Sequence, residues 1–151
     1  MKKLVRNEFV VGCTQEEAFD FLSDLRNEPE WNPDQCQSVE KVTDGPVGRG
    51  TLYRAKWKGS PQIEVEYVHF DRPHSWQAHS DGLLESNFKG MVERHADGAK
   101  LVTELELIPH GFFKLVFPIF KLVFSKSEQS AADRIRKTLE ERYGETARLA
   151  S

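Results

Sequence analysis

The sequence has little of what several classes of protein require. Only two cysteines, Cys13 and Cys36, occur among 151 residues, too few for a disulfide scaffold or a cysteine-based metal cluster. Two reduced thiols are typical of a cytoplasmic protein. Basic residues show no excess, with 21 Lys and Arg against 24 Asp and Glu, which argues against a nucleic-acid partner.

Long apolar runs are also missing. A membrane-spanning helix needs about 20 consecutive apolar residues, so we expect no transmembrane segment. The first residues, MKKLVRNE, have no apolar run behind them, unlike a signal peptide. Hydrophobic residues still make up 38% of the chain, enough for a buried core. The length predicts a single domain over residues 1–151.

Common catalytic and cofactor motifs are absent as well. The glycines at positions 45, 48 and 50 lie between two predicted strands, which favours a hairpin loop over a dinucleotide-binding turn. The five histidines do not gather at metal-ligand spacing on one element. We therefore expect no metal site and no cofactor.

The first third of the chain predicts a strand followed by helices. Residues 4–11 are rich in β-branched and aromatic side chains. Thr14 and Glu17 have the spacing of a capping box, which predicts a helix start. Pro29 and Pro33 flank Trp31, so residues 26–34 form a broken turn or a short second helix.

From residue 36 to 109 the hydrophobic period is two. Turn signals divide this region into six strands with one apolar and one mostly charged face, the pattern of an antiparallel sheet. Asp97-Gly98 predicts a type I′ hairpin turn. Residues 112–143 then predict one long C-terminal helix, kinked or restarted at Pro118 and ended by Gly144.

A sheet with one apolar face must cover it, and only the C-terminal helix is long and apolar enough. A curved sheet around one narrow helix leaves a hollow, which large side chains with polar tips would line as a small-molecule site. The alternative is that these aromatics simply fill the core. The predicted ligand-binding residues are Trp31, Tyr53, Trp57, Tyr67, His69, Trp76 and Phe88, with Phe117 and Phe120 as a lid.

The chain resembles the START-like, or SRPBCC, superfamily, and within it the polyketide cyclase/dehydrase-like proteins. The resemblance rests on the stretch from Thr14 to Trp31-Asn32-Pro33, the glycine-rich loop 45–51, Asp71-Arg72-Pro73 and the entry into the last helix. It implies the α+β helix-grip fold: a curved antiparallel seven-strand sheet around a long C-terminal helix, with a short helix pair after the first strand. It implies no shared catalytic set.

The first functional hypothesis is binding of a lipid, polyketide or aromatic metabolite in this hollow. The second is a cyclase or dehydratase acting there by holding a flexible chain in a productive conformation. Alternation places His69 inside, as a general base or a donor to a ligand carbonyl beside Tyr53; the alternative is a structural histidine. The carboxylates of the strands fall on the opposite face.

The third hypothesis is a partner-binding or regulatory protein that uses the phenylalanine-rich helix. Its phenylalanines, five between residues 112 and 124, are too many for one narrow stripe. The exposed ones could line the mouth of the hollow, form a homodimer contact or touch a membrane surface peripherally. The sequence leaves these alternatives open.

Overall fold

The computed structural model describes residues 3–119 and 131–150. A first strand is followed by two short helices, six further strands and two helical segments, the first of which covers residues 113–119. The labelled elements are β1 (Lys3–Val11), α1 (Gln15–Leu22), a 3-10 turn (Leu25–Asn27), α2 (Glu28–Trp31), β2 (Cys36–Lys41), β3 (Leu52–Trp57), β4 (Ile63–Asp71), β5 (Ser75–Ser80), β6 (Leu84–His95), β7 (Gly98–Pro109) and α4 (Ala131–Ala150).

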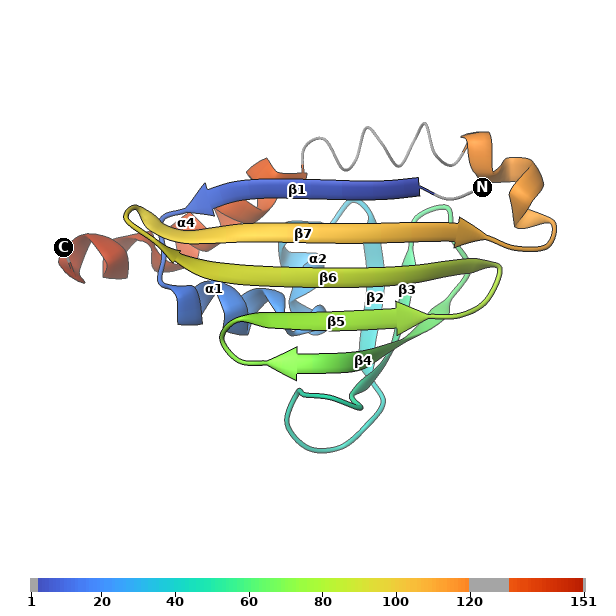
Figure 1. The fold of residues 1–151 in the computed structure, drawn as a ribbon, viewed down its shortest axis with the longest axis horizontal. Helices are drawn as coiled ribbons and strands as arrows, with labels where there is room; N and C mark the ends of the chain where they lie inside the picture. The colour runs from blue at the N-terminus through green and yellow to red at the C-terminus, as the bar shows by residue number, and fades with distance from the viewer. Residues whose placement is uncertain (1–2, 120–130, 151) are drawn as a thin grey trace.

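The strands form one antiparallel sheet in the order β1-β7-β6-β5-β4-β3-β2. The sheet curls, so that β2 and β3 run across the direction of the other strands, and α1, α2 and α4 lie on one face of it (Figure 1). This curled sheet with its C-terminal helix is the α+β helix-grip fold, and the predicted fold class is confirmed.

Local signals in the sequence account for two of the connections. Thr14 Oγ1 accepts from the Glu17 amide, and the Glu17 carboxylate accepts from the Thr14 amide, both at 3.0 Å, so the capping box begins α1 as predicted. The hairpin between β6 and β7 is also present. Its turn is not type I′, because His95 pairs with Gly98, and the two residues between them, Ala96 and Asp97, do not have positive φ.

A bulge in β4 overturns the prediction for His69. Tyr67 pairs with Ala78, but His69 pairs with Gln77, so one extra residue, Val68, shifts the register. Because side chains alternate between the two faces, the extra residue moves His69 to the outer face and turns Phe70 inward. The His69 ring is exposed and lies 3.0 Å from the Ser75 hydroxyl.

The predicted C-terminal helix lies only partly within the described residues, as the segment 113–119 and α4. Pro118 lies within the segment 113–119, and Phe120 and Phe124 lie outside the described residues. Helix α4 does not end at Gly144 but continues to Ala150, since a glycine costs a helix only about 1 kcal/mol. None of the described helices is both long and apolar enough to cross a membrane.

Candidate functional site

A cavity of about 610 Å³ lies between the curled sheet and the helices. The sheet wall comes mainly from β1 and from β4 to β7, and the opposite wall from α2, the segment 113–119 and the start of α4. Most of the lining side chains are apolar. Cavities that hold small molecules have volumes of roughly 300–1,000 Å³ and such linings, so the size suits one small ligand.

Small side chains keep this space open. Ala78, Ser86 and Thr103 face it from three strands, and Ala131 and Ala132 face it from the first turn of α4. Larger residues at these positions would reach into the space. The hollow therefore follows from side-chain size as well as from the curvature of the sheet.

Five of the nine predicted ligand-binding residues line the cavity. They come from α2 and from four different strands, so the fold brings them together although they are far apart in sequence. These residues are Trp31, Trp57, Tyr67, Trp76 and Phe88. Among them, the indole of Trp76 and the ring of Phe88 lie 5.7 Å apart between centroids.

The other four predicted residues are placed elsewhere. Tyr53 is fully buried in the core, where its hydroxyl donates to Asp24 Oδ1 at 3.2 Å, and it is not among the lining residues. His69 points to the outer face, as described above. Phe117 is buried in a separate cluster with Leu84, Leu107 and Phe113, and Phe120 lies outside the described residues.

The segment 113–119 contributes one of its faces to the cavity. Phe113, Val116 and Ile119, three residues apart, line the cavity. Phe113 is buried, whereas Val116 and Ile119 are exposed, as are Phe112 and Leu115 on the other side of the segment. This segment therefore borders the cavity, as the lid prediction required of the region, but through different residues. A homodimer contact or a membrane contact on its exposed side remains a prediction.

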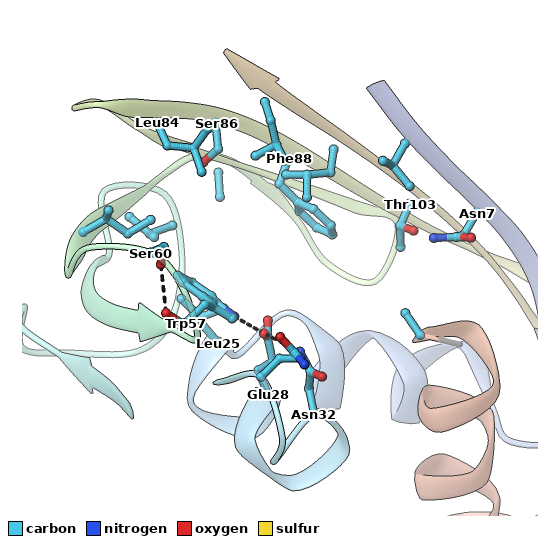
Figure 2. Close-up of a pocket in the computed structure, with 18 of the residues that line it drawn as sticks. Asn7, Leu25, Glu28, Asn32, Trp57, Ser60, Leu84, Ser86, Phe88 and Thr103 are labelled. Carbon is cyan, nitrogen blue, oxygen red and sulfur yellow. Dashed lines mark hydrogen bonds between the residues drawn. The ribbon is translucent and has the colours of Figure 1, made fainter. Parts of the chain in front are cut away.

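A polar cluster that was not predicted from the sequence lies at one end of the cavity. The Glu28 carboxyl, on α2, accepts through Oε2 from the indole nitrogen of Trp57 and from Asn32 Nδ2, the latter at 3.1 Å. Figure 2 shows this carboxyl between Trp57 and Asn32, with Phe88 across the cavity from it. The cluster thus links α2 to the end of β3 beneath an apolar sheet wall.

Helix α4 extends the cluster through Arg134. Its guanidinium donates to Asn32 Oδ1 at 3.1 Å and lies over the Trp31 ring, 6.0 Å from the centroid. Because Asn32 Oδ1 accepts from Arg134, its amide nitrogen is directed to Glu28. Arg134 therefore fixes the orientation of the amide that Glu28 contacts.

The pKa values of two acidic residues in the cavity wall are shifted in opposite directions. Burial raises the pKa of the Glu28 carboxyl above its ordinary value of 4.5, although its hydrogen bonds and the charge of Arg134 oppose the rise. Burial would also raise the pKa of Asp24, but hydrogen bonds from Arg26 outweigh it, and the pKa falls below 3.8. Glu28 is thus the carboxyl that more readily holds a proton.

The spacing around Trp31 contained a signal for this cluster. Glu28, Trp31 and Asn32 stand at i, i+3 and i+4, which places them on one face if residues 28–32 are helical. A predicted cavity residue at position 31 therefore implies cavity positions at 28 and 32. Residues 26–34 were predicted as a broken turn or a short second helix, and only the helix, which the structure shows at Glu28–Trp31, brings these positions together.

No protein-family model matches the chain, and no curated protein matches it. Several solved structures, however, match the chain in fold. The Zhui aromatase/cyclase from Streptomyces sp. R1128 superposes with a TM-score of 0.74 at 10% identity, over 94% of this chain and 96% of that one. Ara h 8.0201 superposes with a TM-score of 0.66 at 18% identity, over 93% and 99%.

Norcoclaurine synthase from Thalictrum flavum, in complex with dopamine and hydroxybenzaldehyde, gives a TM-score of 0.65 at 17% identity, over 93% of this chain and 88% of that chain. At such identities the likeness concerns the fold alone. These neighbours and the curled seven-strand sheet agree with the motifs read from the sequence. The chain therefore has the helix-grip fold that these solved structures share.

Proposed function

We propose that the protein binds a small hydrophobic or amphipathic molecule, of the lipid, polyketide or aromatic-metabolite kind, between the sheet and the helices. The observation that carries this proposal is the cavity of about 610 Å³, with an apolar lining and a polar cluster at one end. Apolar walls supply affinity, and a few fixed polar groups orient the ligand. Trp31, Trp57, Tyr67, Trp76 and Phe88 are the proposed aromatic contacts.

The fold neighbours support the same conclusion. The norcoclaurine synthase structure contains dopamine and hydroxybenzaldehyde, two small aromatic molecules, and the Zhui protein is described as an aromatase/cyclase. A fold that accommodates such molecules elsewhere is consistent with an aromatic-lined cavity here. The ligand itself is not inferred from these proteins, because the shared feature is the fold.

A cavity-filling substitution tests the binding proposal. All three tryptophans of the chain line the cavity, so intrinsic fluorescence reports a bound molecule. With N-phenyl-1-naphthylamine as the probe, we expect quenching in the wild type and binding at least tenfold weaker in Ala78→Phe, which places a ring in the cavity. Gln77→Phe adds the same ring to the other face of β5 and leaves binding unchanged.

Two results would overturn the proposal. One is the absence of binding by the wild type, with native mass spectrometry of protein purified without detergent also showing no retained molecule. The other is an equal loss of affinity in Ala78→Phe and Gln77→Phe, which would mean that the probe binds outside the cavity.

A second candidate, an enzyme of the cyclase or dehydratase kind, is favoured by Glu28 alone. His69 and Tyr53, the residues first considered for this role, do not reach the cavity. Glu28 is a cavity carboxyl with a raised pKa, suited to donate a proton to a departing hydroxyl group and, as the resulting carboxylate, to accept the proton lost from the α-carbon. The test substrate is a phenyl-substituted β-hydroxy ketone, and its loss of water is measured by the absorbance of the conjugated product. Turnover that Glu28→Gln abolishes would support an enzyme, and no turnover would leave binding as the function.

A further inference from the structure

We propose that Glu28, Trp57 and Asn32 form a binding site for a hydroxyl group, so that the ligand is a neutral, largely apolar molecule that carries a hydroxyl. The inference rests on the proposed function, because it assigns the chemistry of one end of the same cavity. It is carried by the convergence of these three side chains on the cavity wall.

The carboxyl of Glu28 has a fixed set of donors. Trp57 and Asn32 both donate to Oε2, and the nearby Cys36 thiol helps to lower the pKa of the carboxyl. Burial raises the pKa of Cys36 to about 12, so the thiol keeps its proton. Arg134 holds the Asn32 amide in place from α4. The carboxyl is therefore held in place before any ligand arrives.

This arrangement leaves acceptor positions at the carboxyl for a ligand. A carboxylate has about four lone-pair sites on its two oxygens, and the hydrogen bonds from Trp57 and Asn32 both fall on Oε2. Glu28 is itself a lining residue of the cavity, and Figure 2 shows its carboxyl directed toward the space below the sheet. A ligand group in that space can complete the hydrogen bonding of Glu28.

A hydroxyl is the group that suits this position in both protonation states of Glu28. It can donate to an ionised carboxylate and accept from a protonated carboxyl, whereas an ammonium group fits only the first state and a carboxylate only the second. A charged ligand would also lose its hydration among apolar walls, at high cost. Leu84, Phe88 and Leu105 present such a wall from the sheet.

Two probes of similar shape test this inference. We expect 2-naphthol to bind the wild type about tenfold more tightly than 2-methylnaphthalene in isothermal titration calorimetry, since a hydrogen bond to a charged or polarised carboxyl is worth about that factor. The naphthalene ring is common to both, so the difference isolates the hydroxyl group.

The variant Glu28→Met/Trp57→Phe removes the acceptor and also the indole donor that could replace it. We expect this protein to bind the two probes with equal affinity, whatever the loss of the Trp57 indole does to the affinity for both. Thr103→Val is the matched control, because it removes a hydroxyl from the opposite wall of the cavity while keeping the side-chain shape. It should retain the tenfold preference.

The outcomes separate the two proposals. If the wild type binds both probes with equal affinity, the hydroxyl site is wrong and the binding cavity stands. The hydroxyl site is also wrong if the double variant keeps the preference, or if Thr103→Val loses it. If neither probe binds the wild type, the hydroxyl site is wrong, and the proposed binding function is contradicted as well if N-phenyl-1-naphthylamine does not bind and native mass spectrometry shows no retained molecule. The wild-type comparison requires no variant to fold.

Discussion

The space between the sheet and the helices has two regions that differ in how they are filled. Beneath α1, the packed region, Phe19 meets Phe70 and Trp76 edge to face, with ring centroids 5.3 and 5.4 Å apart. Beneath α2 and the start of α4, the hollow region, the sheet presents Ala78, Ser86 and Thr103 and leaves about 610 Å³ empty. The same sheet thus forms a core at one end and a cavity at the other.

The difference shows that side-chain size on both layers decides where this fold is hollow. In the packed region, large rings come from both the helix and the strands. In the hollow region, α4 contributes Ala131 and Ala132 opposite small strand residues. Trp76 stands at the border, since it packs against Phe19 and also lines the cavity.

The largest expected effect comes from emptying the packed region. Phe19→Ala removes a fully buried ring and should lower the free energy of unfolding by about 3–5 kcal/mol. Phe88→Ala, in the hollow region, should cost roughly half of that or less, because its ring is only partly buried and already borders a cavity. Urea unfolding of the two variants measures the difference. Equal losses would mean that the two regions are equally well packed.

A smaller effect is expected at the border. A Cβ at Gly90 would overlap the Trp76 ring, which pairs with it across β5 and β6. Gly90→Ala should therefore displace the indole, lower the free energy of unfolding by about 1–3 kcal/mol and change the affinity for cavity probes. Gly48→Ala is the control, since nothing lies near a Cβ at that position. Unchanged stability and probe affinity in Gly90→Ala would show that Trp76 is not held at this border.

Most of the fold could be predicted from the sequence because its signals are local and repeated. The period of two from residue 36 to 109 and the capping box at Thr14 each specify an element without knowledge of the rest. The face of His69 could not be predicted, because the bulge in β4 adds a single residue whose position leaves no mark on the alternation. One such residue reverses the side on which all later side chains of the strand lie.

The candidate site could be predicted in its apolar part and not in its polar part. Trp57, Trp76 and Phe88 follow from strand alternation, which holds over many residues. Glu28 and Asn32 lie on and just after a helix of four residues, too short to show a period of its own. Their direction depends on contacts with Trp57 and Arg134, which are distant in sequence.

The smallest expected effect is on the pH dependence of stability. The two carboxyls of the cavity wall, Glu28 and Asp24, should change the free energy of unfolding with pH in opposite directions. The raised pKa of Glu28 means that the folded state binds its proton more tightly than the unfolded state. Above pH 4.5, the ordinary pKa of this group, the wild type therefore loses stability as the pH rises through the folded-state pKa. Asp24 acts in the opposite way, because its pKa is lowered. Its contribution is present above pH 3.8 and is lost as the pH falls.

Two amide variants make this opposition measurable. Urea unfolding across the pH range should show Glu28→Gln gaining stability relative to the wild type as the pH rises above 4.5. Asp24→Asn should gain relative to the wild type only as the pH falls below 3.8. Each variant serves as the control for the other, since both replace one carboxyl by an amide of nearly equal size. Parallel pH profiles for the two variants would mean that both carboxyls experience the same surroundings, and the polar end of the cavity would then lack the buried character that distinguishes Glu28.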